Sequence, residues 1–184
     1  MNTIDGIKLM NLQRKWYGKD GVIYFDIAAS LDITGHQWIL RLKEKGYRFS
    51  DCAKSVIYSD GFKTTPGVTI KIVVLKGILF EYWNRTIEKI SADADKREWG
   101  KPDAEAACLI REMFTDEEIR AMGLQRIIVM SEPINDSRGV PRLLGVNGGG
   151  HGRLLSAYRV KPDLKWGDHV GFAFVESFVY NATK

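Results

Sequence analysis

The sequence lacks several features that usually indicate where a protein acts. It has two cysteines in 184 residues, Cys52 and Cys108, far apart and both in expected helices, so we expect buried thiols rather than a disulfide. No apolar run approaches the roughly 20 residues that a membrane span needs, so we expect no membrane span. The stretch that follows Met1 has no apolar core of the secretory kind. We therefore expect no signal peptide and, by default, a cytoplasmic protein.

A concentrated charge of one sign is also missing. The formal net charge is +4, but the bases are interspersed with acids, and no stripe or cluster of Lys and Arg occurs. Proteins that bind nucleic acids usually show such a basic footprint. Nucleic acid is therefore an unlikely partner.

No motif of catalysis or metal binding is present. The glycine run Gly148–Gly152 lacks the Lys-Ser/Thr that completes a phosphate loop. His151, Asp163, Asp168 and His169 do not have the spacing of zinc or calcium ligands. No Ser or Cys stands in the context of an activated nucleophile. The sequence predicts no enzyme, no cofactor and no metal site.

Residues 1–65 are expected to form an α-rich N-terminal extension. Gly21–Ala28 alternates like a short strand, and His36–Lys45 has helical spacing and stops at Gly46. Ser50 is placed to cap a second short helix. Two successive short helices leave open an alternative function, a small basic nucleic-acid-binding or regulatory protein, although the second helix offers only Lys54 as a basic reader.

From residue 66 the pattern becomes that of an α+β domain, with helices segregated from a mostly antiparallel sheet. Val68–Phe80 is rich in β-branched residues and is the strongest strand signal. Asp93–Phe114 is expected to be mostly helical, interrupted near Gly100, with Pro102 at a first helical position. Thr115 and Glu118 form a capping box that begins a further helix. The remaining strands are expected at Gln125–Met130, Arg142–Val146, Arg153–Arg159 and Val170–Val175.

The segment Leu143–Val175 has an unusual texture. Glycine and aromatic residues punctuate positions that follow neither a helix nor a strand period, and the segment closes with the apolar run Gly171–Phe174. A fixed frame that carries chemically arbitrary side chains favours a binding surface over a reaction centre.

This segment resembles the tail of the C-type lectin fold in variable proteins of diversity-generating retroelements, a tail shared with formylglycine-generating enzymes. The matching residues are Gly149-Gly150, Leu155–Arg159, Pro162-Asp163 and Gly171–Phe174. Leu155 and Ala173 stand where the family usually has Arg. The family's upstream Gly-Gly-Ser-Trp signature is reduced to Asn147–Gly150.

The resemblance implies a C-type lectin-like domain over residues 66–184, with two or three packed helices and a variable region of about 143–175. In such proteins an error-prone reverse transcriptase randomises adenines in a template copy, so that the binding surface varies. The implied variable, ligand-binding residues, with side chains in solvent, are Val146, Asn147, Gly149, His151, Leu154, Ser156, Tyr158, Arg159, Val160, Leu164, Gly167, Asp168, His169 and Val170. The implied scaffold is Gly152, Ala157, Pro162, Trp166, Gly171, Phe172 and Phe174.

Further expectations follow from the resemblance. The ligand is a protein or a surface polymer of unspecified identity, bound without calcium, and the oligomeric state stays open. An oxidase of the formylglycine type would need a cysteine pair near the C-terminal end, and both cysteines lie upstream. The last strand should pair with Val68–Leu75, and replacement of His151, Tyr158 and Val170 together by Ser should leave thermal stability almost unchanged.

Overall fold

A computed structural model describes residues 15–28, 31–150 and 152–180 of the chain. Its centre is a nine-stranded sheet in the order β1-β2-β4-β9-β5-β7-β8-β3, with β6 paired to β7 off this path. Within the described ranges, only β5 with β9 and β3 with β8 pair in parallel, so the predicted mostly antiparallel sheet is confirmed. The strands are β1 Tyr17–Lys19, β2 Val22–Ile27, β3 Arg48–Phe49, β4 Val68–Lys76, β5 Arg126–Val129, β6 Ile134–Asn135, β7 Pro141–Asn147, β8 Leu154–Arg159 and β9 Val170–Tyr180.

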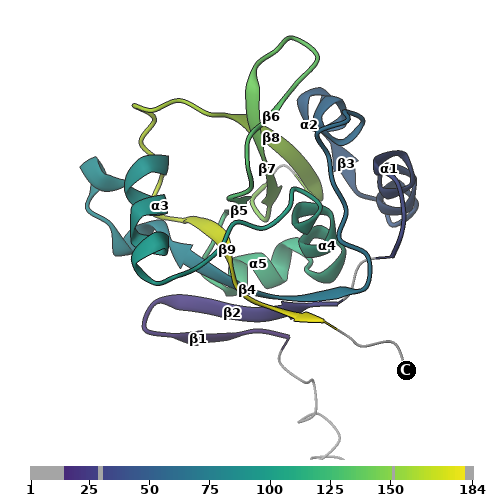
Figure 1. The fold of residues 1–184 in the computed structure, drawn as a ribbon. Coiled ribbons are helices and arrows are strands. Elements are labelled where there is room, and N and C mark those ends of the chain that lie inside the picture. The colour runs from purple at the N-terminus through teal and green to yellow at the C-terminus, as the bar shows by residue number, and fades with distance from the viewer. Residues whose placement is uncertain (1–14, 29–30, 151, 181–184) are drawn as a thin grey trace, which may run out of the picture.

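Helices cover both faces of the sheet. The helices are α1 Gly35–Glu44, α2 Asp51–Ile57, α3 Ile87–Lys96, α4 Ala106–Met113 and α5 Asp116–Ala121, with 3₁₀ turns η1 Gly77–Leu79 and η2 Tyr82–Asn84. Helices α1, α2, α4 and α5 bury their apolar residues with one face of the sheet, and α3 packs on the other. Figure 1 shows α3 on the opposite side of the sheet from α1, α2 and α4. No helix in the described part of the chain is long and apolar enough to cross a membrane.

The pairing of the last strand with Val68–Leu75 is confirmed. Strand β9 runs antiparallel to β4, with Phe172 opposite Leu75 and Phe174 opposite Val73. On its other side β9 pairs in parallel with β5. The C-terminal strand therefore lies in the middle of the sheet, where both of its edges are hydrogen-bonded.

The helix ends follow local sequence signals. The Ser50 hydroxyl accepts a hydrogen bond from the amide of Ala53 and caps α2. Thr115 and Glu118 make both hydrogen bonds of the predicted capping box at the start of α5. Gly46 and Gly123, just beyond α1 and α5, have left-handed φ angles of 81° and 79°. These predictions are confirmed, because caps depend on residues only a few positions apart.

The helical expectation for Asp93–Phe114 is wrong in its boundaries. Helix α3 already begins at Ile87, because the Thr86 hydroxyl accepts a hydrogen bond from the amide of Lys89 and caps it. Helix α4 begins only at Ala106, so Pro102 is not a first helical residue. Gly100 exchanges two backbone hydrogen bonds of 2.8 Å with Val175 of β9, which keeps the connection between the helices extended.

Residues 15–28 and 31–65 share the sheet and the core of the rest. Strand β2 pairs with β4 along its whole length, from Val22 opposite Leu75 to Ile27 opposite Ile70. Trp38 and Val56, from α1 and α2, are buried in the same cluster as residues of β4 and β7. The segment therefore adds strands as well as helices to one common core.

Both cysteines are free thiols, as expected. Cys108 is fully buried, and burial raises the pKa of its thiol, with Glu105 and Glu112 adding to the effect. Cys52 is only half-buried, so its predicted burial is wrong. It lies near the start of α2, where Arg138 donates a hydrogen bond of 3.3 Å to its sulfur.

Candidate functional site

Two adjacent hollows gather many of the predicted binding residues. The main hollow has a volume of about 390 Å³ and is lined by Gln125, Arg126, Tyr158 and the segment Leu164–Val170. The glycine hollow has a volume of about 360 Å³ and is lined by Arg120, Gln125, Arg126, Asn147, Gly149 and Gly150. Because Gln125 and Arg126 line both, we treat them together as the double hollow.

A chain of hydrogen bonds crosses the sheet beside the double hollow. Asn147 of β7 stands opposite Arg126 of β5 in the register. The Tyr158 hydroxyl donates to Asn147 Oδ1 at 2.5 Å, and Asn147 Nδ2 donates to the Ser156 hydroxyl at 3.2 Å. Ser156 and Tyr158 are two residues apart on β8 and therefore share one face of the sheet. The network fixes the tyrosine relative to the end of β7.

Gly145 gives the tyrosine its space. A Cβ atom on Gly145 would lie 2.7 Å from Tyr158 Cε2 and 2.9 Å from Ile128 Cδ1. Contacts that short do not occur between real Cβ atoms and their neighbours, so only glycine allows the ring to cross β7. The missing side chain is thus part of the site's construction.

Aromatic contacts support the floor of the main hollow. The edge of one ring meets the face of the next between Tyr158 and Trp166 and between Trp166 and Phe172, with centroids 5.9 Å apart in both pairs. Trp166 is buried, and no group in the described residues accepts a hydrogen bond from its indole Nε1. The Arg126 guanidinium lies over the Tyr158 ring, 5.3 Å from its centroid. The hollow combines aromatic surface with polar groups, as ligand sites commonly do.

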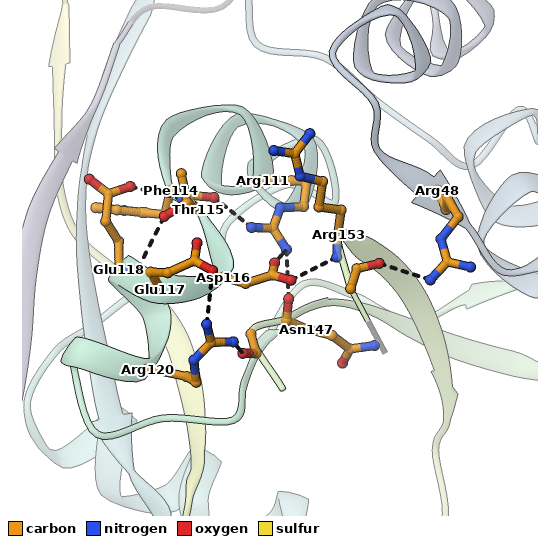
Figure 2. Close-up of polar contacts among 12 residues, drawn as sticks. Arg48, Arg111, Phe114, Thr115, Asp116, Glu117, Glu118, Arg120, Asn147 and Arg153 are labelled. Carbon is orange, nitrogen blue, oxygen red and sulfur yellow. Dashed lines mark hydrogen bonds and ion pairs between the residues drawn. The ribbon is translucent and has the colours of Figure 1, made fainter. Parts of the chain in front are cut away.

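A buried arginine donates a hydrogen bond to the residue that precedes the glycine run Gly148–Gly152, and Figure 2 shows this arginine beside Asp116 and Asn147. Arg111 of α4 is fully buried and lies 3.0 Å from Asp116 Oδ1. It donates hydrogen bonds of 2.6 Å to the carbonyls of Asn147 and Phe114. Burial lowers the pKa of Arg111, while the Asp116 charge opposes that shift. Asp116 Oδ2 in turn accepts the Arg153 amide at 2.7 Å, which joins the start of α5 to the start of β8.

Two other arginines donate hydrogen bonds to carbonyl groups at the two ends of this glycine run. Arg120 donates to the Gly148 carbonyl at 2.6 Å, and Arg48 donates to the Gly152 carbonyl at 3.0 Å (Figure 2). The amides of Gly148 and Gly149 both donate to the Gln125 carbonyl, at 2.8 and 3.1 Å. These two amides already have an acceptor, which argues against a phosphate loop in which they would face an anion.

The solvent exposure expected of the binding residues is wrong at three positions. Val146 faces the helices α4 and α5, Asn147 is buried within the hydrogen-bond network, and Val170 packs with Trp166 and Phe172. Strand residues point alternately to the two faces, and here helices or loops cover both. Exposed are Arg159, Leu164, Gly167 and His169; half-buried are Gly149, Leu154, Ser156, Tyr158, Val160 and Asp168; His151 lies outside the described residues.

The expected scaffold residues lie mostly inside. Trp166, Gly171, Phe172 and Phe174 are buried, as a supporting frame requires. Gly152 and Ala157 are half-buried, and Pro162 is exposed. A Cβ on Gly171 would lie 2.6 Å from Val74 Cγ1, so this glycine permits close packing of β9 on its neighbours.

The sequence analysis missed the basic residues of the site. Arg126 opens a strand that was recognised only as buried, and Arg120 lies on α5. Arg126 and Ile128 are two positions apart on the strand, so their side chains point to the same face of the sheet. A charged residue on the same face as a buried one was the signal in the sequence that could have identified Arg126. What could not be read from the sequence is that β5 lies beside β7 and brings Arg126 to Tyr158.

The structure also bears on the metal and nucleic-acid interpretations. In the described ranges no group of three or more His, Cys, Asp or Glu side chains is placed to hold a metal ion. Asp168 and His169 are 3.6 Å apart at the rim of the main hollow. On α1, Arg41 and Lys45 both form ion pairs with Glu112, so these bases are partly neutralised within the chain.

Comparison of the chain with protein-family models, with curated proteins and with solved structures found no match.

Proposed function

We propose that the chain is a ligand-binding protein and that the double hollow is its binding site. The observation that carries the proposal is that one hollow is lined by Tyr158 and the segment Leu164–Val170. All but two of the residues in this segment were expected from the sequence to belong to a binding surface. Buried aromatic residues and the Asn147 network support that hollow from below. A supported floor with exposed residues at its rim suits the recognition of a partner.

The proposal is binding without catalysis. The main hollow contains an Asp168–His169 pair, but its described lining residues include no Ser, Thr or Cys. An acid–base pair without a nucleophile within reach does not make the arrangement that acyl transfer needs.

We further propose that the domain has a C-type lectin fold and that retroelement-driven adenine mutagenesis varies this surface. The antiparallel pairing of β4 with β9, which joins the two ends of the domain, supports the fold. The positions proposed to vary are those around the double hollow whose side chains reach solvent and hold no other residue of the site in place, namely Arg159, Leu164, Asp168 and His169. The ligand is proposed to be a protein or a surface polymer.

The DNA that flanks the gene tests the diversification proposal. We expect a near copy of the stretch encoding Leu143–Val175, next to a reverse-transcriptase gene and differing almost only at adenines. The differences should fall on codons of exposed residues such as Leu164 and His169, and should spare the buried Phe172 and Phe174. Absence of a second copy would end the diversification proposal and leave a site with a fixed ligand.

A further inference from the structure

We infer that the double hollow takes a ligand carrying an oxyanion, a carboxylate or a phosphate, and that the Arg126 guanidinium binds it. The inference rests on the proposed binding function and adds the chemistry of the ligand. It starts from a positive charge that no described residue neutralises.

Arg126 differs from most other arginines of this structure. Among the described residues no carboxylate or carbonyl accepts a hydrogen bond from its guanidinium, and its one side-chain contact of this kind is with the Tyr158 ring. Six other arginines are each paired with an acid: Arg41 with Glu112, Arg97 with Asp93, Arg111 with Asp116, Arg120 with Glu117, and both Arg138 and Arg142 with Asp136. An unpaired guanidinium that is half-buried in a hollow favours a negatively charged occupant.

The tyrosine holds this arginine in place and leaves its hydrogen atoms available. The carbon of the planar guanidinium group lies 5.3 Å from the Tyr158 ring centroid, and this cation–π contact needs no hydrogen bond to an oxygen. The N–H groups lie in the plane of that group and can form two parallel hydrogen bonds to one oxyanion. Since Asn147 and Gly145 fix the position of Tyr158, the arginine above it is also prepared before a ligand arrives.

The lining of the glycine hollow fits an anion. Its described lining residues include no Asp or Glu. Arg120 also lines it but is paired with Glu117 at 2.9 Å, so Arg126 supplies the charge for the ligand. The acid of the main hollow, Asp168, lies next to His169. The apolar surfaces of Tyr158, Leu164 and Trp166 can take the uncharged part of the same ligand.

Titration of the ¹⁵N-labelled chain with inorganic phosphate and, separately, with acetate tests the inference, with chloride keeping the ionic strength constant. We expect saturable amide shifts at Arg126, Gly149 and Tyr158 with dissociation constants in roughly the millimolar range. Arg126→Gln should weaken binding at least about tenfold, because charge-assisted hydrogen bonds are lost. Arg126→Lys keeps the positive charge but cannot form two parallel hydrogen bonds to one oxyanion, so this variant should bind with intermediate strength.

Arg97→Gln is the matched control. Arg97 also lies over an aromatic ring, 5.1 Å from the Trp99 centroid, but its Nε donates to Asp93 at 2.8 Å. This variant should bind both anions like the wild type. Unchanged thermal unfolding of Arg126→Lys confirms that weaker binding comes from the lost hydrogen bonds and not from unfolding.

The results separate the possible ligands and the two proposals. Tighter binding of phosphate indicates a phosphate-bearing ligand, and acetate binding at least as tight as that of phosphate indicates a carboxylate. Absence of saturable shifts with either anion, or equal shifts in wild type and Arg126→Gln, overturns the inference. If the flanking DNA nevertheless contains a near copy of the stretch encoding Leu143–Val175, the proposal of a diversified binding surface is retained and its ligand is neutral.

Discussion

At Gly145 a single missing side chain decides the geometry of the site. The Tyr158 ring occupies the space that a Cβ would fill, and from there its hydroxyl reaches Asn147. The residue carries no functional group, yet Tyr158, Asn147 and Arg126 depend on it. A glycine in a strand often marks such a close approach.

We predict that Gly145→Ala destabilises the protein by about 1–3 kcal/mol, because the added methyl group overpacks the contact with Tyr158 and Ile128. The displaced tyrosine should also lose its hydrogen bond to Asn147. Thermal unfolding and the amide shift of Asn147 measure the two effects. Gly150→Ala is the control, since a Cβ there has nothing within 4 Å. Equal stability of the two variants would contradict this account of the site.

Among the elements, the β6–β7 turn depends on one carboxylate. The Asp136 side chain accepts hydrogen bonds from the amides of Arg138 and Val140, at 2.9 and 3.0 Å, and from Arg142 Nε at 2.9 Å. Desolvation raises the pKa of Asp136, but these hydrogen bonds outweigh it and lower the pKa to about 2. The ionised form therefore stabilises the folded turn.

This shift predicts a specific dependence on pH. A depressed folded-state pKa contributes stability above the unfolded value of about 3.9, and that contribution is lost as the pH falls toward 2. Asp136→Asn should be less stable than wild type at pH 7 and should lose less stability between about pH 4 and pH 2. Urea unfolding midpoints at several pH values measure the difference. Parallel curves for the two proteins would show that Asp136 does not act in this way.

At the scale of the whole molecule, the boundary expected near residue 65 crosses a continuous core. Glu105 is fully buried, and its carboxylate accepts hydrogen bonds from Trp38 Nε1 at 2.7 Å and from the Thr65 amide at 2.9 Å. Both donors precede residue 66. Strand β4 also has β2 as its neighbour.

We predict that residues 66–184 alone do not fold cooperatively. The fragment would expose one edge of β4 and leave buried Glu105 without two of its hydrogen bonds, a large penalty for a carboxylate in the core. Far-UV circular dichroism during heating distinguishes the outcomes. A cooperative transition in the fragment would show that the C-terminal part is an independent domain.

The sequence predicted those parts of the fold that local signals determine. The Thr115 cap, the Ser50 cap and the strand that begins at Val68 depend on neighbouring residues, and all were found. The late start of α4 could not be foreseen, because Gly100 is held extended by Val175, a residue far along the chain.

The candidate site was predicted in part for the same reason. The pattern of glycine and aromatic residues between irregular positions identified the segment that contains Tyr158 and His169, and both residues line the main hollow. Burial of Val146 and Val170 depends on the helices and rings that cover each face, which no local pattern records. Arg126 was missed because its closeness to Tyr158 results from the order of the strands.

The measurement that tests the central claim most directly compares the stability of two variants by thermal unfolding. The claim is that exposed residues of the C-terminal segment can vary on a buried frame. The burial of Val170 overturns the earlier expectation that replacing it with Ser, together with His151 and Tyr158, is harmless.

The account predicts that Arg159→Ser, Leu164→Ser and His169→Ser combined change the midpoint by less than about 4 °C, since surface substitutions contribute little. Val170→Ser alone should lower it by roughly 4–16 °C, because two buried methyl groups are lost and a hydroxyl is buried. A triple variant as unstable as Val170→Ser would contradict the claim.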